Sequence, residues 1–356
     1  MKYLSNKNGF LGIDNKVNFK EKVVVVPFGL EKTVSYGSGT KNGPKEIIKA
    51  SHQVELYDEE LNCEPYKKIG IKTLKPFKID KDIKKALKKM SDINQEILDK
   101  KLFPITFGGE HSITPGCIAP FVKKHKEICL LHFDAHADLR ESYNGEKFSH
   151  ASAIRRCLDH KNVSIISFGI RNISQSEIPF LKKNSSRIDI FWAKDKSKWD
   201  LKKFKKLIKN KTVYLTFDVD GLDSSIMPAT GTPEPGGLLW DETLNIIKIA
   251  AKNSKIVGAD VNELFEMCDM DYYPVYCVHH KYEPEKTTKM DGKEQQPYRR
   301  KNWSSLMMFN CGHQENKKLT PGVVNTQTGR WLHGFGWLPD KEADIGKIPE
   351  EWNWLD

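Results

Sequence analysis

Apolar runs and amphipathic segments alternate along the chain from about residue 21 to residue 263. Seven continuous apolar runs predict buried strands: Val23–Val26, Leu102–Phe107, Ile128–Phe133, Val163–Phe168, Ile188–Trp192, Val213–Phe217 and Ile256–Val261. Seven amphipathic segments predict helices: Pro44–His52, Asp80–Asp99, Pro115–His125, Ala151–Leu158, Ser176–Lys182, Leu201–Lys209 and Asp241–Ala251. Continuous apolar strands separated by helices are typical of a parallel sheet covered on both faces. The pattern therefore predicts a three-layer α/β fold with a mainly parallel sheet.

The pattern changes after Glu266. The stretch from Met267 to Asp356 has no clear alternation of strands and helices and is rich in aromatic residues, Asn, Pro and paired charges. We therefore predict two domains, an α/β domain at residues 1–266 and an irregular C-terminal segment at residues 267–356.

Polar residues follow three of the apolar runs, where active sites of parallel sheets lie. Six of them are metal-ligand types: His111, Asp134, His136, Asp138, Asp218 and Asp220. If each strand continues, residues two apart project to the same side. A single Asp before a helix is more often a helix cap, but four carboxylates brought together without cations would repel strongly. Six hard donors exceed the needs of one ion, so they predict two divalent ions, and the Asp-rich set favours manganese over zinc, copper or iron–sulfur.

Composition narrows the class of protein. The chain has 356 residues, 38% of them hydrophobic and 29% charged, and a net charge of +10. Its lysines are spread over helix faces rather than gathered in an Arg-rich block, so no nucleic-acid partner is expected. No signal-like or membrane-spanning apolar stretch is present, and no membrane partner is expected. Seven scattered cysteines favour a reducing compartment, and we expect a cytoplasmic protein.

Several motifs of the chain resemble those of one enzyme family. They are Ser35–Thr40, Gly108–Ser112, His132–Asp138, Phe148–Ser152, Thr216–Asp223, Pro228–Gly237 and Gly258–Glu263. Over residues 20–266 the chain resembles the ureohydrolases (arginase, agmatinase and relatives), most closely agmatinases. The resemblance implies an arginase-like fold and two Mn²⁺ ions. One ion would bind His111 and Asp138, the other would bind His136 and Asp220, and Asp134 and Asp218 would bridge them.

The resemblance also implies roles for further residues. His150 would transfer protons at the mouth of the site and contact the substrate, Asp220 would share in catalysis, and Glu263 and Thr232 would bind the substrate. Without the resemblance, the alternative interpretations are that His150 is a surface residue, that Glu263 belongs to a structural ion pair and that Thr232 is a turn residue. The implied substrate is a small cationic guanidino compound, first of all agmatine, which would give urea and putrescine. A homo-oligomer, trimer or hexamer, is implied as well.

The C-terminal segment departs from that family. After Glu263 an agmatinase would continue into a long final helix, which this sequence does not show. Residues 270–356 instead resemble the end of a bacterial and phage glycosyltransferase-like family, for example in Asn302–Cys311 and Ile348–Leu355. Three alternatives therefore stay open: an active hydrolase, an inactive fusion that acts only as a metal-binding scaffold, and a glycosyltransferase-like protein. Arginine, guanidinobutyrate and aminopropylagmatine stay open as substrates.

Overall fold

The structure is a computed structural model that divides into two compact units, Met1–Glu266 and Met267–Asp356. It describes residues 1–14, 20–35, 38–265, 273–279, 287–288, 294–295, 303, 307–310, 313–339 and 345–348. Each unit has its own hydrophobic core.

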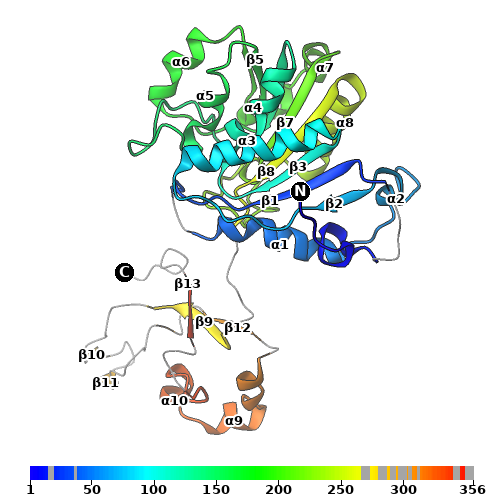
Figure 1. Ribbon diagram of the computed structural model, residues 1–356. Helices are drawn as coiled ribbons and strands as arrows, with labels where there is room; N and C mark the ends of the chain where they lie inside the picture. The colour runs from blue at the N-terminus through cyan, green and yellow to red at the C-terminus, as the bar shows by residue number, and fades with distance from the viewer. Residues whose placement is uncertain are drawn as a thin grey trace. The chain divides into compact units, whose positions relative to one another are not determined.

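An eight-stranded sheet forms the centre of the first unit (Figure 1). Its strands are β1 (Val23–Phe28), β2 (Ile71–Thr73), β3 (Phe103–Gly108), β4 (Ile128–Phe133), β5 (Val163–Phe168), β6 (Ile188–Phe191), β7 (Thr212–Asp218) and β8 (Lys255–Asn262). The spatial order is β2-β1-β3-β8-β7-β4-β5-β6. All neighbouring strands pair in parallel. The predicted parallel sheet is therefore confirmed, and so is the three-layer class.

Helices connect these strands, as the amphipathic pattern predicts. The α-helices of the first unit are α1 (Gly43–Ala50), α2 (Pro65–Ile69), α3 (Ile83–Asp99), α4 (Thr114–Lys124), α5 (Ala153–Cys157), α6 (Ile178–Lys183), α7 (Leu201–Ile208) and α8 (Trp240–Asn253). Within the described residues, no helix combines the length and apolarity that a membrane span needs. The short elements α2 and β2 were missed, because five and three residues carry too little periodicity to stand out.

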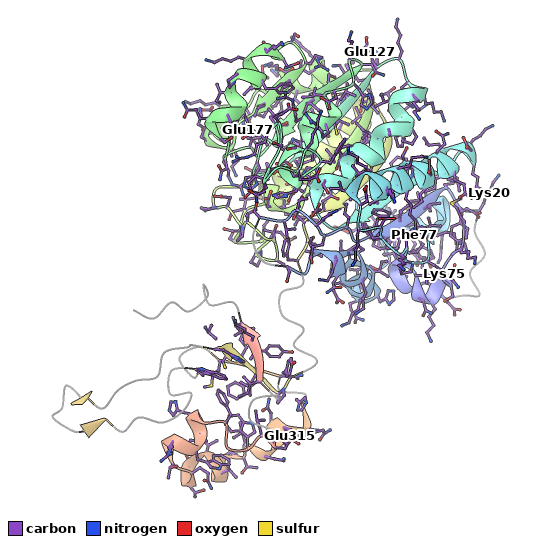
Figure 2. All side chains as sticks on the ribbon, turned by 60° about the vertical axis from the view of Figure 1, so that its left-hand side comes forward. Lys20, Lys75, Phe77, Glu127, Glu177 and Glu315 are labelled. Carbon is purple, nitrogen blue, oxygen red and sulfur yellow. The ribbon has the colours of Figure 1, made fainter. Side chains whose placement is uncertain are left out.

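Alternate residues of each strand point to opposite faces, and the two faces bury different helices. Leu130 packs into a core that α3 and α4 cover, whereas its neighbour Leu131 packs into a core that α7 and α8 cover. Phe77, labelled in Figure 2, packs its ring on Phe28 at a centroid distance of 6.3 Å. Because both faces are covered, functional side chains are left to the strand ends.

The longest helix shows how local sequence sets an element. Buried residues of α3 recur at helical spacing, at Ile83, Ala86, Met90 and Ile97, and form an apolar stripe. Asp82 caps the helix, since its carboxylate accepts the backbone N–H of Lys85 at 3.0 Å. The stripe packs on α4, and Asn94 donates to the Cys117 carbonyl at 3.0 Å.

The second unit carries more regular structure than its sequence indicates. A small sheet joins β12 (Met307–Phe309), β9 (Val275–Val278) and β13 (Ile345–Ile348), with β9 in the middle. The unit also has two short α-helices, α9 (Pro321–Thr326) and α10 (Gly329–His333), the 3-10 helix η11 (Gln314–Lys318), and a strand pair, β10 (Thr287–Thr288) with β11 (Glu294–Gln295). Its core gathers Val275, Cys277, Phe335, Trp337, Leu338 and Ile345.

Candidate active site

A cavity of about 190 Å³ lies at the carboxyl edge of the first unit's sheet. Its lining includes every residue that the sequence analysis nominated: His111, Asp134, His136, Asp138, His150, Asp218, Asp220, Thr232 and Glu263. They follow β3, β4, β7 and β8, which are adjacent at the centre of the sheet. Because parallel strands end at one edge, residues up to 152 positions apart meet there.

The prediction that alternate strand positions bring these residues together is wrong for the residues that follow β4. β4 ends at Phe133, so Asp134, His136 and Asp138 lie in a loop and not at alternate positions of a strand. Asp138 has a φ of +50°, which is uncommon for a residue other than glycine and turns its carboxylate inward. Glu177, labelled in Figure 2, fixes the next residue by accepting the Leu139 N–H at 2.8 Å. The loop conformation, not strand pleating, gathers these side chains.

Asp134 offers one oxygen to each of two histidines. Its Oδ2 lies 3.1 Å from His111 Nδ1, and its Oδ1 lies 3.6 Å from His136 Nδ1. Asp138 Oδ2 also lies 3.1 Å from His111 Nδ1, and Asp220 Oδ2 lies 3.0 Å from His136 Nδ1. The cluster therefore has two centres, and Asp134 belongs to both. Asp218 Oδ2 lies 3.5 Å from His111 Nδ1 and joins the same centre.

Thr216 and Asp260 orient the imidazole ring of His111 through a chain of hydrogen bonds. Its Nε2 lies 2.9 Å from Thr216 Oγ1, and this hydroxyl donates to Asp260 Oδ1 at 2.7 Å. Since the hydroxyl has one proton, it accepts the Nε2–H of His111, so Nδ1 is the nitrogen with a lone pair when the ring is neutral. Burial lowers the pKa of His111, but Asp134 and Asp138 outweigh it and raise this pKa, so without metal Nδ1 holds a proton that a metal ion would replace. Nδ1 is buried and makes no hydrogen bond with suitable geometry to a described group. Such an orphaned nitrogen, aimed at two carboxylates, fits a metal ligand.

The sequence analysis overlooked His132 as a partner of this cluster. Both of its ring nitrogens are engaged, Nδ1 with Ser167 Oγ at 2.9 Å and Nε2 with Asp134 Oδ2 at 2.9 Å. With His111 and Asp134, His132 forms one of two groups of side chains close enough to hold a metal ion. Because both of its ring nitrogens already have partners, it is better suited to position Asp134 than to bind the ion. Its place two residues before Asp134 is the sequence signal that could have found it.

The charges of the cluster call for cations. Burial, together with repulsion from Asp134, raises the pKa of Asp138 to about 7. Burial, together with Asp220 and Asp134, raises the pKa of Asp218 well above its ordinary value. Burial lowers the pKa of His136, but Asp134 and Asp220 outweigh it and raise this pKa to about 11. Protons and metal ions compete for such sites, and the set of carboxylates and imidazoles fits two divalent ions.

Glu263 completes the inner wall of the cavity. Its Oε1 accepts the backbone N–H of His111 at 2.8 Å, and its φ is +63°. Burial, with repulsion from Glu110, raises the pKa of Glu263 well above its ordinary value. None of the ion pairs among the described residues involves Glu263. A buried carboxylate that is held in a strained conformation and makes no ion pair among the described residues suits a cationic ligand.

His150 and Thr232 lie on the outer part of the cavity lining. The His150 ring meets the Tyr143 ring edge-on at a centroid distance of 5.4 Å, and burial with the nearby His111 and His136 lowers its pKa to about 4. Thr232 Oγ1 donates to Asp220 Oδ2 at 3.3 Å, so Thr232 contacts the cluster.

The comparisons with known proteins agree with this geometry. The model of the Arginase family matches residues 21–271, so the chain belongs to the arginase family. N(1)-aminopropylagmatine ureohydrolase of Synechocystis sp. is 33% identical over 274 residues, which cover 74% of this chain and 88% of that protein. Agmatinase of Bacillus cereus is 34% identical over 283 residues, 77% of this chain and 95% of that protein. The chain is thus an enzyme, a hydrolase of the ureohydrolase type.

Solved structures agree in fold. A putative agmatinase from Clostridium difficile has a TM-score of 0.62 and 30% identity, and the match covers 70% of this chain and 90% of that one.

A shorter match, 55% identical over 98 residues, relates 28% of this chain to 37% of Protein CDI of Arabidopsis thaliana. The likeness of the C-terminal segment to glycosyltransferase-like proteins stays a prediction.

Proposed function

We propose that the protein hydrolyses agmatine to urea and putrescine with two manganese ions. The observation that carries the proposal is the convergence of four carboxylates, two histidines and Glu263 on one cavity. Relatives named agmatinase and N(1)-aminopropylagmatine ureohydrolase support the guanidino substrate class. The acidic lining favours a cationic substrate over a neutral or anionic one.

The chain's residues divide into two sets of metal ligands. We assign His111 and Asp138 to one ion, His136 and Asp220 to the other, and Asp134 and Asp218 to both. The two oxygens of Asp134 face different histidines, which supports its shared role. Hard oxygen donors outnumber imidazoles, which favours manganese. When bound, such a pair of ions acts as a Lewis acid and lowers the pKa of water toward neutrality.

Glu263 is the residue we assign to the substrate's guanidinium. A carboxylate and a planar guanidinium form charge-assisted hydrogen bonds. Glu263 Oε1 is already held by the His111 N–H, so the carboxylate is oriented before a substrate arrives. Thr232 lines the same cavity beside Asp220 and would contact the same end of the substrate.

Cleavage of the carbon–nitrogen bond requires a proton for the leaving amine. His150 lines the cavity, and its imidazole can take up and release a proton, so we assign it this transfer together with Asp220. The low pKa of His150 means that the ring is neutral before reaction, so it could accept the proton that the attacking water loses and then pass a proton to the leaving amine.

A substrate panel tests the proposal. Purified protein with added Mn²⁺ is assayed for urea release from agmatine, aminopropylagmatine, guanidinobutyrate and arginine, and its bound metal is measured in the same sample. We expect agmatine to give the highest kcat/KM and two metal ions per chain. Urea release that survives complete metal removal would contradict the mechanism, and preference for another compound would replace the substrate.

The unit Met1–Glu266 is the part to which we assign catalysis. The expected trimer or hexamer is checked by light scattering of the full chain. Turnover by that chain also decides whether the hydrolase works without the long final helix expected of an agmatinase.

A further inference from the structure

Glu110 is a buried carboxylate that the proposed chemistry does not use. It lies between the Gly108–Gly109 pair and His111, and it is fully buried. Its neighbour Gly109 lies so close to Leu30 that a Cβ would come within 2.0 Å of the Leu30 carbonyl oxygen. This contact brings the segment after β1 against Glu110, and the Glu110 N–H donates to the Leu30 carbonyl at 2.8 Å.

The carboxylate of Glu110 binds that segment tightly. Its Oε2 accepts the backbone N–H groups of Lys32 at 2.6 Å and Thr33 at 2.5 Å. Its Oε1 accepts the hydroxyls of Thr33 at 3.0 Å and Ser112 at 2.5 Å. Glu110 thereby fixes the side chain of Thr33, although the two residues are 77 positions apart in the sequence.

Thr33 in turn contacts His150 twice. The backbone N–H of His150 donates to Thr33 Oγ1 at 3.0 Å, and His150 Nδ1 lies 3.1 Å from the same oxygen. On the other side of the ring, His150 Nε2 lies 2.8 Å from Ser35 Oγ. Ser35 and His150 both line the cavity.

The direction of these hydrogen bonds decides the tautomer of His150. A hydroxyl has one proton to donate, and a carboxylate only accepts. Thr33 therefore gives its proton to Glu110 and is an acceptor toward His150, so Nδ1 carries the ring proton. In a neutral ring Nε2 is then the bare nitrogen, and the Ser35 hydroxyl can donate to it.

We propose that Thr33, held by Glu110, is a positioning residue that fixes the Nδ1–H tautomer of His150, so that Nε2 is the nitrogen that exchanges protons in the cavity. The catalytic consequence rests on the proposed function, but the tautomer does not depend on turnover. Ser35 is the hydroxyl that adapts, donating to Nε2 when the ring is neutral and accepting from it when the ring is charged.

Two substitutions separate positioning from folding. Thr33→Val keeps the shape of the side chain but removes the acceptor, whereas Thr33→Ser keeps the hydroxyl. We expect Thr33→Val to lower kcat about 10- to 100-fold with KM within about twofold, because proton transfer loses its aligned base. Thr33→Ser should restore kcat to within a few-fold. Equal losses in both variants, or an unchanged kcat in Thr33→Val, would overturn the positioning role.

A spectroscopic test reads the tautomer directly. Histidine labelled with ¹⁵N is observed in the full chain with diamagnetic Mg²⁺ added, and His150→Asn assigns the signal by its disappearance. We expect a protonated Nδ1 and a bare Nε2 in the native protein, and a mixed or reversed tautomer in Thr33→Val. A bare Nδ1 in the native protein would overturn the proposal.

A matched control removes the other hydroxyl that donates to the Glu110 carboxylate, that of Ser112. Ser112→Ala takes one donor from Glu110 but does not touch His150, so the tautomer should stay Nδ1–H. A tautomer change in Ser112→Ala as large as in Thr33→Val would overturn the specific role of Thr33. Absence of urea release from every guanidino substrate would refute the proposed function, while the ¹⁵N spectra would still decide the tautomer.

Discussion

The two centres of the cluster differ in how firmly the protein holds them. At the inner centre, the His111 side chain is 1% exposed and is oriented through Thr216 to Asp260. At the outer centre, the His136 side chain is 29% exposed and is held through Nδ1 by Asp220 and Asp134. The inner centre is therefore organised by the fold, whereas the outer one depends more on its carboxylates and on what they bind.

The difference has a chemical consequence for the proposed reaction. His136, with a side chain 29% exposed, and the half-buried His150 are more accessible to water and substrate than the buried His111. The buried inner centre lies beside Glu263, which accepts the His111 N–H. The proposed reaction would combine firm binding of one ion with accessible chemistry at the other, and Asp134, which faces both histidines, links the two centres.

The strongest test removes the joining residue. Asp134→Asn keeps the size of the side chain but loses the charge that both centres share. We expect loss of both metal ions and a fall in turnover on the order of 10³-fold or more, because several kcal/mol of charge stabilisation disappears. Urea release and bound metal are measured together, with the exposed Asp92→Asn as control. Retention of either ion at full affinity would break the shared role.

Glu263→Gln tests the substrate side of the inner centre. The amide oxygen can still accept the His111 N–H, so the metal content should stay the same. A charged hydrogen bond to the guanidinium is lost, and kcat/KM should fall roughly 10- to 100-fold. Steady-state kinetics with agmatine check this value. Unchanged kinetics would remove Glu263 from the site, and loss of metal would make it a structural partner of His111.

Thr216→Val sharpens the contrast between the centres. Without the hydroxyl, the Nε2–H of His111 loses its acceptor, and the inner ion should bind roughly 10- to 100-fold more weakly. The outer ion should bind nearly as before. Calorimetric titration with Mn²⁺ separates the two steps, and Thr216→Ser is the matched control. Equal weakening of both steps would mean that the centres are not independently organised.

The pH dependence of the metal-free protein gives the smallest effect. His136 has a pKa of about 11 in the folded chain, above the ordinary 6.5, so the folded state holds more protons than the unfolded state between these values. Stability without metal should therefore fall as pH rises from 7 to 9, by a few degrees of melting temperature. Asp138, with a pKa of about 7, acts in the same direction at lower pH, between about 4 and 7.

Added Mn²⁺ should remove this fall, because the metal replaces the protons at the same nitrogen and oxygen atoms. Thermal melts at several pH values, with chelator or with Mn²⁺, make the comparison. A metal-free protein that becomes more stable between pH 7 and 9 would contradict the assigned charges of His136.

The amino-acid sequence alone determined the elements and the kinds of ligand. Continuous apolar runs predicted β1, β3, β4, β5, β6, β7 and β8, since burial on both faces requires such runs. Their types and their places after strands nominated the six Asp and His residues proposed as metal ligands, whereas His150, Thr232 and Glu263 came from the family resemblance.

Only the tertiary structure decided how those residues are aimed. Asp138 points inward through a left-handed backbone conformation, and His132 and Thr216 acquire their roles from partners across the sheet. The link from Glu110 through Thr33 to His150 joins residues 77 and 117 positions apart. A hydrogen bond depends on atoms within about 3 Å of each other. The periodicity of a sequence does not specify such distances, so it could not predict these roles.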